Sequence, residues 1–266
     1  MNKGRILMRK ILLTSVGVAA LAVSANATDF TLSGTAKIKV ADDGNTSVDV
    51  STAVGVSKTF DNGMVLSLSN NNMANAGELT VTSDAVAVTF GDFDQNEKTP
   101  GLNGDSAASD IASDGITHSS DAGGISLGAT VAGVGIGAAM NNEGDTMFGG
   151  SFTSDMGGMA VTIGGDVYSD NTSSADQTTM GVKAALGALT VVAHSKQVEA
   201  ASGGTDTVSY SAAYTARGLV IGFQGNDADA SSYSATYTVV PGMQFEIGSK
   251  DDGTTSTSSA ELQMTF

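Results

Sequence analysis

Apolar and polar residues alternate with a period of two in many segments of this 266-residue chain. From residue 30 to residue 40, the even positions hold phenylalanine, leucine, glycine, alanine, isoleucine and valine, and the odd positions hold threonine, serine and lysine. The same pattern recurs over residues 159–168, 189–196, 243–247 and 261–266. Successive side chains of a β-strand point to opposite faces. These segments are therefore predicted to be strands with one apolar and one polar face.

Two kinds of all-β protein contain such strands, and the composition favours one of them. A soluble β-sandwich needs large apolar side chains between its sheets. Here the apolar positions are often Val, Ala, Met or Gly, and aromatic residues make up only 5% of the chain. Alternating segments of about ten residues are typical of a transmembrane β-barrel, whose apolar face meets lipid. We therefore predict an all-β, antiparallel transmembrane barrel, with the sandwich as the alternative.

Composition argues against several other classes of protein. The chain has no cysteine, which excludes a disulfide framework and cysteine-ligated zinc. Its formal charge of −16 argues against a nucleic-acid binder, which needs a clustered basic patch. No GxSxG, HExxH or P-loop motif is present, and His118 and His194 are the two histidines. We therefore predict that the protein is not an enzyme and has no resident cofactor or metal site.

Turn-forming residues divide the chain into hairpins. Seven short turns are predicted, at Asp61–Gly63, Ser83–Asp84, Ala132–Gly133, Met156–Gly158, around Gly187, at Arg217–Gly218 and at Pro241–Gly242. Eight longer connections alternate with them, over residues 42–46, 70–77, 92–124, 141–145, 170–177, 199–206, 226–230 and 251–256. These connections predict about 16 strands, with 14 as the fallback, and place both ends of the barrel domain on the short-turn side.

The turn at Ala132–Gly133 rests on a change of parity. Apolar residues hold odd positions from Ile125 to Val131 and even positions from Val134 to Met140. A straight strand keeps one parity, so a hairpin turn is predicted between the two runs. The alternative is a turn at residues 122–124 followed by a bulged strand.

The first 27 residues are predicted to be a cleaved secretory signal peptide. Four basic residues precede the apolar run Ile11–Val23, and Ala25-Asn-Ala27 matches a signal-peptidase site. The run is shorter than the about 20 residues of a transmembrane helix. Residues 28–266 would then form the barrel domain, with 8 basic against 28 acidic residues.

The chain resembles the Gram-negative general porins of the alphaproteobacterial type. The likeness is carried by Phe30-Thr-Leu-Ser-Gly-Thr-Ala36, by the hairpin residues 59–68, by Val88-Thr-Phe-Gly-Asp92 and by the last strand with its terminal Phe266. The resemblance implies an outer-membrane location, a homotrimer and a long third loop folded into the lumen. It also implies that Phe266 belongs to the signal read by the barrel-assembly machinery. The chain departs from the family in having Arg217 as its one arginine after the signal peptide, where related porins have an arginine cluster on the pore wall.

Charged residues are predicted to line the passage. The third loop, residues 92–124, carries a formal excess of six negative charges, and its candidate constriction residues are Asp94, Glu97, Lys98, Asp105, Asp110 and Asp114. Lys37, Lys39, Lys183 and Lys196, with Asp166 as a pairing partner, are expected on the opposite wall by parity. An anionic rim concentrates cations and slows anions. The alternative is that the loop acids lie on a solvated surface and the lysines are screened by ion pairs with Asp49 or Asp166.

These features predict a passive, water-filled outer-membrane channel for small hydrophilic solutes and ions, with a mild cation preference. Aromatic residues fall at strand ends on the short-turn side, as an interfacial girdle requires: Phe30, Phe60, Phe152, Tyr214, Tyr237 and Phe266. Acidic outer loops, such as Asn226-Asp-Ala-Asp229, offer at most weak calcium binding or divalent bridges to lipopolysaccharide. The alternatives are a surface or periplasmic β-protein with a structural or adhesive role, and a plugged structural barrel.

Overall fold

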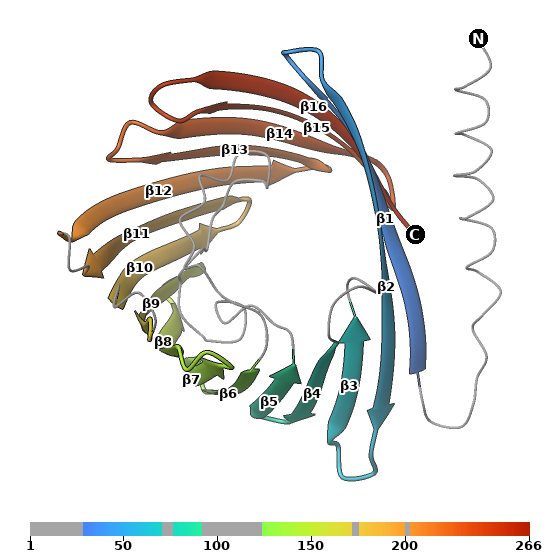
Figure 1. The fold of residues 1–266 in the computed structure, drawn as a ribbon, viewed down its shortest axis with the longest axis vertical. Helices are drawn as coiled ribbons and strands as arrows, with labels where there is room; N and C mark the ends of the chain where they lie inside the picture. The colour runs from blue at the N-terminus through green and yellow to red at the C-terminus, as the bar shows by residue number, and fades with distance from the viewer. Residues whose placement is uncertain (1–28, 71–76, 92–123, 172–175, 200–202) are drawn as a thin grey trace.

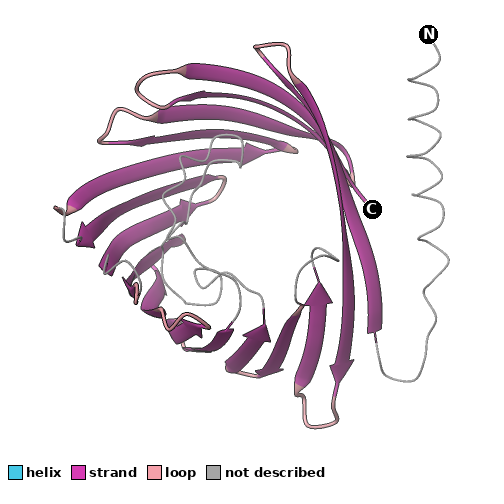
Figure 2. Ribbon diagram, viewed as in Figure 1, coloured by secondary structure: helices cyan, strands magenta, loops and turns pink. Residues whose placement is uncertain are grey.

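The computed structural model describes residues 29–70, 77–91, 124–171, 176–199 and 203–266. Within them, sixteen antiparallel strands form one closed barrel in which each strand pairs with its neighbours in the sequence, and β1 pairs with β16 (Figures 1 and 2). The strands are β1 (Asp29–Ala41), β2 (Thr46–Thr59), β3 (Val65–Asn70), β4 (Glu78–Ser83), β5 (Val86–Gly91), β6 (Gly124–Val131), β7 (Val134–Asn141), β8 (Thr146–Asp155), β9 (Met159–Ser169), β10 (Asp176–Leu186), β11 (Leu189–Glu199), β12 (Thr205–Ala216), β13 (Leu219–Asn226), β14 (Ser231–Val240), β15 (Met243–Asp251) and β16 (Ser256–Thr265).

The predicted strand number and the predicted order of turns are confirmed. Turns of two or three residues follow the even-numbered strands, except that five residues join β2 to β3, and connections of four residues or more follow the odd-numbered strands. The disputed turn lies at Ala132–Gly133, where both residues have positive φ angles of 51° and 82°. Such angles suit a two-residue hairpin turn, and glycine adopts them at little cost. The alternatives of 14 strands and of one bulged strand over residues 125–140 are therefore wrong.

The barrel closes between its first and last strands. Thr35 of β1 lies opposite Thr265 of β16, and the pairing continues to Ala41 and Ser259. The ladder is completed by two backbone hydrogen bonds: Gly34 N donates to Phe266 O at 2.8 Å, and Phe266 N donates to Gly34 O at 2.9 Å. Closure of this kind leaves no unpaired strand edge along the seam.

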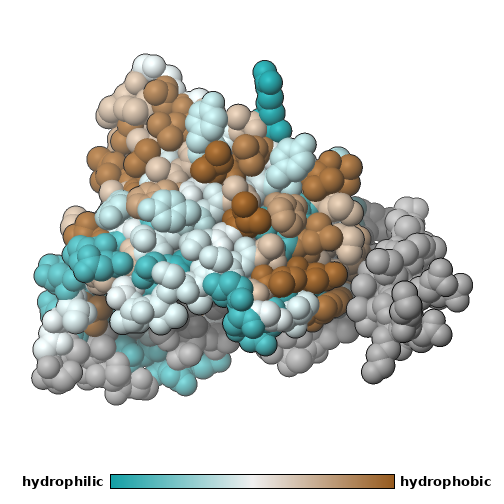
Figure 3. Space-filling model, turned by 90° about the horizontal axis from the view of Figure 1, so that it is seen from above, coloured by the Kyte–Doolittle hydropathy of each residue, from teal (hydrophilic) through white to brown (hydrophobic). Residues whose placement is uncertain are grey.

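The side chains of the wall are arranged with apolar residues outside and polar residues inside. Large apolar residues on the outer parity are exposed, for example Ile136 at 60% and Met180 at 67%. On the other parity, Thr179 and Ser126 are buried at 0% and 3%. Apolar side chains are spread over the outer face that Figure 3 shows. A sandwich packs its apolar faces together, so the sandwich alternative is wrong.

Aromatic side chains mark the outer face next to the short turns. Phe152, Tyr214 and Tyr237 are exposed at 48%, 53% and 49%, and they pair with Val134, Leu189 and Leu219 at the turn ends of neighbouring strands. This is the position expected for an interfacial girdle. No helix among the described residues is long and apolar enough to cross a membrane.

Two groups of predictions fall on residues that the structure does not describe. The signal peptide, residues 1–27, is one of them. The other is the set of constriction residues Asp94, Glu97, Lys98, Asp105, Asp110 and Asp114, together with the inward fold of their loop.

Candidate functional site

The inner wall beside the seam carries a cluster of charged residues, which we call the seam cluster: Lys37, Lys39, Asp49, Glu246 and Glu261. All five lie on the polar parity of β1, β2, β15 and β16, because Lys37 pairs with Asp49, Lys39 with Glu261, and Glu261 with Glu246. Lys37 Nζ lies 3.4 Å from Glu261 Oε1. The Glu261 side chain is 10% exposed and that of Lys37 is 33% exposed, so the pair keeps partial access to solvent. Positively and negatively charged side chains therefore lie side by side at the seam.

A second charged cluster lies on β9, β10 and β11, and we call it the far cluster: Asp166, Lys183, His194 and Lys196. Asp166 and Lys196 both pair with Thr179 of β10, which lies between them. Adjacent strands are about 4.8 Å apart, so these two side chains start about 10 Å from each other. Asp166 is 3% exposed and His194 is 8% exposed. Both clusters face the interior of the barrel.

Small residues make room for the far cluster. His194 pairs with Gly181, which in turn pairs with Gly164 on β9. A Cβ atom added to Gly181 would lie only 2.8 Å from the Cβ of His194. Real Cβ atoms do not approach other atoms so closely, so the close approach of β11 at His194 and Ala193 requires glycine at residue 181.

The two clusters lie on opposite sides of the barrel. β1 and β9 are separated by eight steps around the sheet in either direction. The sequence analysis placed Lys37, Lys39, Lys183 and Lys196 together on one wall, and the structure separates the first two from the last two. The structure places Asp166 and Lys196 on either side of Thr179, whereas Lys183 stands four residues from Thr179 along β10 and Lys37 and Lys39 lie across the barrel.

Five charged or titratable wall residues were not proposed as site residues from the sequence. They are Glu78, His194, Glu246, Lys250 and Glu261, all on the inward parity. Their positions in alternating segments were a usable signal, since Glu246 stands between Phe245 and Ile247.

Apart from Asp29 and Asp155 at the short-turn rim, the inward strand positions hold five lysines and five carboxylates. These are Lys37, Lys39, Lys183, Lys196 and Lys250, and Asp49, Glu78, Asp166, Glu246 and Glu261. The described wall is therefore balanced in formal charge.

A buried aspartate holds together the loops that follow β7 and β9. Asp145 is 1% exposed, and its partner Tyr168 belongs to a buried cluster with Ala139 and Met147. Its carboxylate accepts hydrogen bonds from Asn141 Nδ2 at 2.8 Å, from Tyr168 OH at 3.1 Å and from the backbone N of Asn171 at 2.8 Å. A buried carboxylate is tolerated when it is hydrogen-bonded in this way. The network fixes the shape of the barrel mouth at this point.

Acidic side chains at the loop end mostly bond to their own turns. Asp252 Oδ1 accepts from Thr254 Oγ1 at 2.7 Å, from Thr255 N at 2.8 Å and from Thr254 N at 2.9 Å. The hydrogen bond from the Thr254 hydroxyl, followed by those from the two backbone amides, holds the pKa of Asp252 below its ordinary value. In the segment considered for calcium, Asn226 Oδ1 accepts from the backbone of Ala228 and Ala230. Among the described residues, no group of three or more His, Cys, Asp or Glu side chains is placed to hold a metal ion.

Comparisons with known proteins identify the architecture. No family model matches the sequence, and no curated protein matches it either. Among solved structures, two mutants of the porin of Rh. blastica align with TM-scores of 0.64, at 14% and 13% identity, over 90% of this chain and 100% of theirs. A triple mutant of the Rhodopseudomonas blastica porin aligns with a TM-score of 0.63 at 14% identity over the same shares. The chain therefore has the fold of these porins, a closed barrel of sixteen strands.

Proposed function

We propose that this protein is a passive outer-membrane channel for small hydrophilic solutes and ions. One observation carries the proposal: a closed barrel has its large apolar side chains outside and its hydroxyl, amide and charged side chains inside. Only a bilayer, or a partner of similar polarity, stabilises an apolar band of this kind around a whole barrel. Barrels of 16 to 18 strands are wide enough to enclose an aqueous channel. Such transport requires no catalytic step and no cofactor.

The location and assembly of the channel are part of the proposal. The signal-like residues 1–27 would direct the chain out of the cytoplasm of a Gram-negative bacterium and then be cleaved. The terminal Phe266 would be recognised by the barrel-assembly machinery, and three copies would form the working unit. The aromatic residues beside the short turns support a membrane interface at that end, which we assign to the periplasmic side.

A mild cation preference is proposed, and it would originate outside the described wall. Above the short-turn rim, where Asp29 and Asp155 lie, the inward strand positions balance five lysines against five carboxylates, so they impose little net field. Residues 92–124, in contrast, carry a formal excess of six negative charges. If these acids narrow the passage, they raise the local concentration of cations. The charges of the wall then change the electric field in the passage only locally, and the charges of the loop set the sign of that field.

Planar-bilayer recording of the refolded mature chain in a salt gradient tests the function. Stepwise conductance with a cation-leaning reversal potential is expected. A barrel that is heat-modifiable on gels but silent in the bilayer would instead be a plugged structural barrel. A chain that stays folded and monomeric without detergent would be a surface or periplasmic β-protein.

The loop proposal needs its own variants. Changing Asp94, Glu97, Asp105 and Asp110 to their amides should move the reversal potential toward anions. The matched control is the double change Lys37→Met and Glu261→Gln, which removes one charge of each sign from the wall. An unchanged reversal potential in the four-site variant would remove these acids from the constriction.

A further inference from the structure

Two charged side chains of the seam cluster are left without a partner by the ion pair beside them. Lys37 Nζ contacts Glu261 Oε1 at 3.4 Å. Lys39 lies directly opposite Glu261, but it forms no ion pair or hydrogen bond within the part of the chain that the structure describes. Asp49 lies directly opposite Lys37, and it too has no such partner among the described residues. One positive and one negative charge therefore remain uncompensated on the adjacent strands β1 and β2.

The two uncompensated groups lie close enough to act on one small molecule. Ser47 lies opposite Lys39 and Asp49 lies opposite Lys37, so Lys39 and Asp49 are diagonal neighbours across the two strands. Diagonal neighbours in an antiparallel sheet are about 7–8 Å apart. The four-carbon stem of lysine is flexible, so the ammonium can adjust its distance from the aspartate. A solute with an ammonium and a carboxylate on the same carbon atom can therefore meet both groups at once.

Small hydroxyl side chains surround the two charges and leave them accessible from the lumen. Ser47 and Ser51 flank Asp49 on the inner face of β2, and all three residues are exposed. Lys39 is half-buried. The hydroxyl of Ser47 can donate a hydrogen bond to a carboxylate that lies against Lys39. A solute can thus reach both charges without displacing a large side chain.

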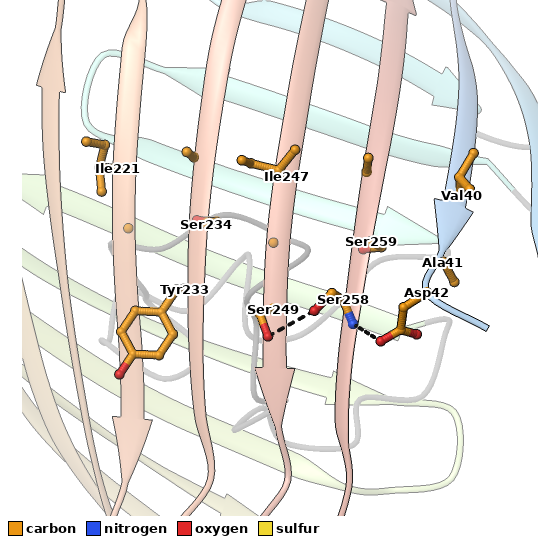
Figure 4. A pocket seen from close by; sticks show the side chains of 14 residues that line it. Val40, Ala41, Asp42, Ile221, Tyr233, Ser234, Ile247, Ser249, Ser258 and Ser259 are labelled. Atoms are coloured by element: carbon orange, nitrogen blue, oxygen red, sulfur yellow. Dashed lines mark hydrogen bonds between the residues drawn. The ribbon is translucent and has the colours of Figure 1, made fainter. Parts of the chain in front are cut away.

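The backbone next to Lys39 is held at the loop end of the seam. Asp42 follows β1, and its backbone N donates to Ser258 O at 2.9 Å. The carboxylate of Asp42 accepts from Ser258 N at 2.9 Å, and the Ser258 hydroxyl donates to Ser249 Oγ at 3.3 Å (Figure 4). These bonds tie the end of β1 to β16 and β15. They fix the backbone from which Lys39 projects and occupy the nearest carboxylate in the following turn.

The charges around the site favour neither sign alone. The seam cluster holds two lysines and three carboxylates, of which Lys37 and Glu261 compensate each other. A single cation attracted by Asp49 is repelled by Lys39, and a single anion experiences the reverse. A zwitterion with its ammonium toward Asp49 and its carboxylate toward Lys39 is attracted by both. A direct pair between the two exposed side chains would contribute little, so it competes weakly with the solute.

The far cluster does not offer the same opportunity. Each of its four residues has an interaction partner, and Asp166 and His194 are buried. Lys39, in contrast, is the third residue from the loop end of β1. A solute that enters from the loop side meets the seam cluster near the mouth of the barrel.

We propose that Lys39 and Asp49 form a weak binding site for small zwitterionic solutes of the α-amino acid type. Asp49 binds the ammonium, and Lys39 with Ser47 binds the carboxylate. The proposal rests on the proposed function, because a water-filled channel brings such solutes to the inner wall.

Saturation-transfer NMR on the refolded mature chain in a non-ionic detergent tests the proposal. The probes are L-alanine and lactamide, an uncharged molecule of the same atomic composition. Each exposed ion pair strengthens binding about twofold to fivefold, so two pairs should make L-alanine bind about fourfold to twenty-fivefold more tightly than lactamide. Propionate and ethylammonium carry one charge each and should bind less tightly than L-alanine.

Variants of the two residues separate the site from the rest of the wall. Lys39→Met and Asp49→Asn should each weaken the binding of L-alanine by about twofold to fivefold. The double variant keeps the formal charge of the wall and should bind L-alanine and lactamide equally. The exchange Lys39→Asp with Asp49→Lys should restore the preference, because the zwitterion can bind in the opposite direction. The matched controls Glu78→Gln and Lys250→Met remove inward charges elsewhere and should leave the preference unchanged.

Other outcomes overturn the proposal. These are equal binding of the two probes by the unaltered chain, a preference that survives the double variant, and an exchange variant that folds but shows no preference. Loss of the preference in Glu78→Gln or Lys250→Met would assign it to the field of the whole wall instead. Planar-bilayer recording of the same preparations distinguishes this failure from that of the proposed function. A conducting barrel without the preference refutes the site alone, whereas a silent barrel refutes the channel even where the preference is present.

Discussion

The terminal ring of Phe266 lies over Gly34, and this contact makes a quantitative prediction about the seam. A Cβ atom added to Gly34 would lie 2.6 Å and 2.7 Å from two ring carbons of Phe266 and 3.1 Å from Ser51 O. The ring must move in a Gly34→Ala variant, and overpacking of this kind costs about 1–3 kcal/mol. Alanine in a strand gains about 0.5–1 kcal/mol over glycine, which offsets part of that cost.

A double-mutant cycle measures the interaction between residue 34 and the ring of Phe266. With Phe266 present, Gly34→Ala should lower the free energy of unfolding. With Phe266→Ala in the background, the added methyl group no longer meets the ring, and Gly34→Ala should be neutral or stabilising. The coupling energy should therefore be about 1–3 kcal/mol, within the range of contacting residues.

Urea unfolding in lipid vesicles, followed by the gel shift of the folded barrel, measures all four variants. Gly150→Ala is the matched control, because it lies on an outward position and its added Cβ would have a nearest neighbour at 3.3 Å. Additive effects of the two changes, within about 0.5 kcal/mol, would refute the claim that Gly34 exists to admit the ring.

Three further predictions concern the mouth and the wall. Asp145→Ala removes the acceptor of three buried hydrogen bonds and should lower the free energy of unfolding by about 2–3 kcal/mol, measured by urea unfolding. The pKa of Asp252 is lower in the folded protein than in the unfolded chain. The ionised Asp252 therefore stabilises the fold at pH values above its unfolded pKa, and this stabilisation is lost as the pH falls through its folded pKa. Thr254→Ala should raise the folded pKa of Asp252, measured by NMR titration. Lys37→Glu makes the balanced wall negative and should shift the reversal potential toward cations, and adding Glu261→Lys should reverse that shift.

The turns and strand parities were predictable from sequence because both are local properties. Ala132–Gly133 needs positive φ angles, and glycine in the second position provides one of them cheaply. The parity of Lys37 follows from its immediate neighbours, since a one-residue shift would place it among apolar residues. Local rules of this kind were enough to give the strand number and the face on which Lys37, Lys39, Lys183 and Lys196 lie.

The arrangement of those lysines around the barrel was not predictable in the same way. Lys37 and Lys183 share a face of the sheet but stand seven strands apart by the shorter way round the barrel, and this separation depends on how the ring closes. The burial of Asp145 also depends on distant partners, since Tyr168 and Asn171 lie 23 and 26 residues away in sequence. Hydrogen bonds between two loops leave no periodic signal in either of them.

The pairing of β1 with β16 has a consequence for the folding of the chain before the barrel closes. Until the last ladder forms, both strands present rows of unsatisfied amide and carbonyl groups, which are templates for pairing with any other extended polypeptide. The two strands are the first and the last in the sheet, so one of these unpaired edges is synthesised long before the other. The unfinished sheet must therefore be shielded until this ladder forms, and slow closure should appear as aggregation.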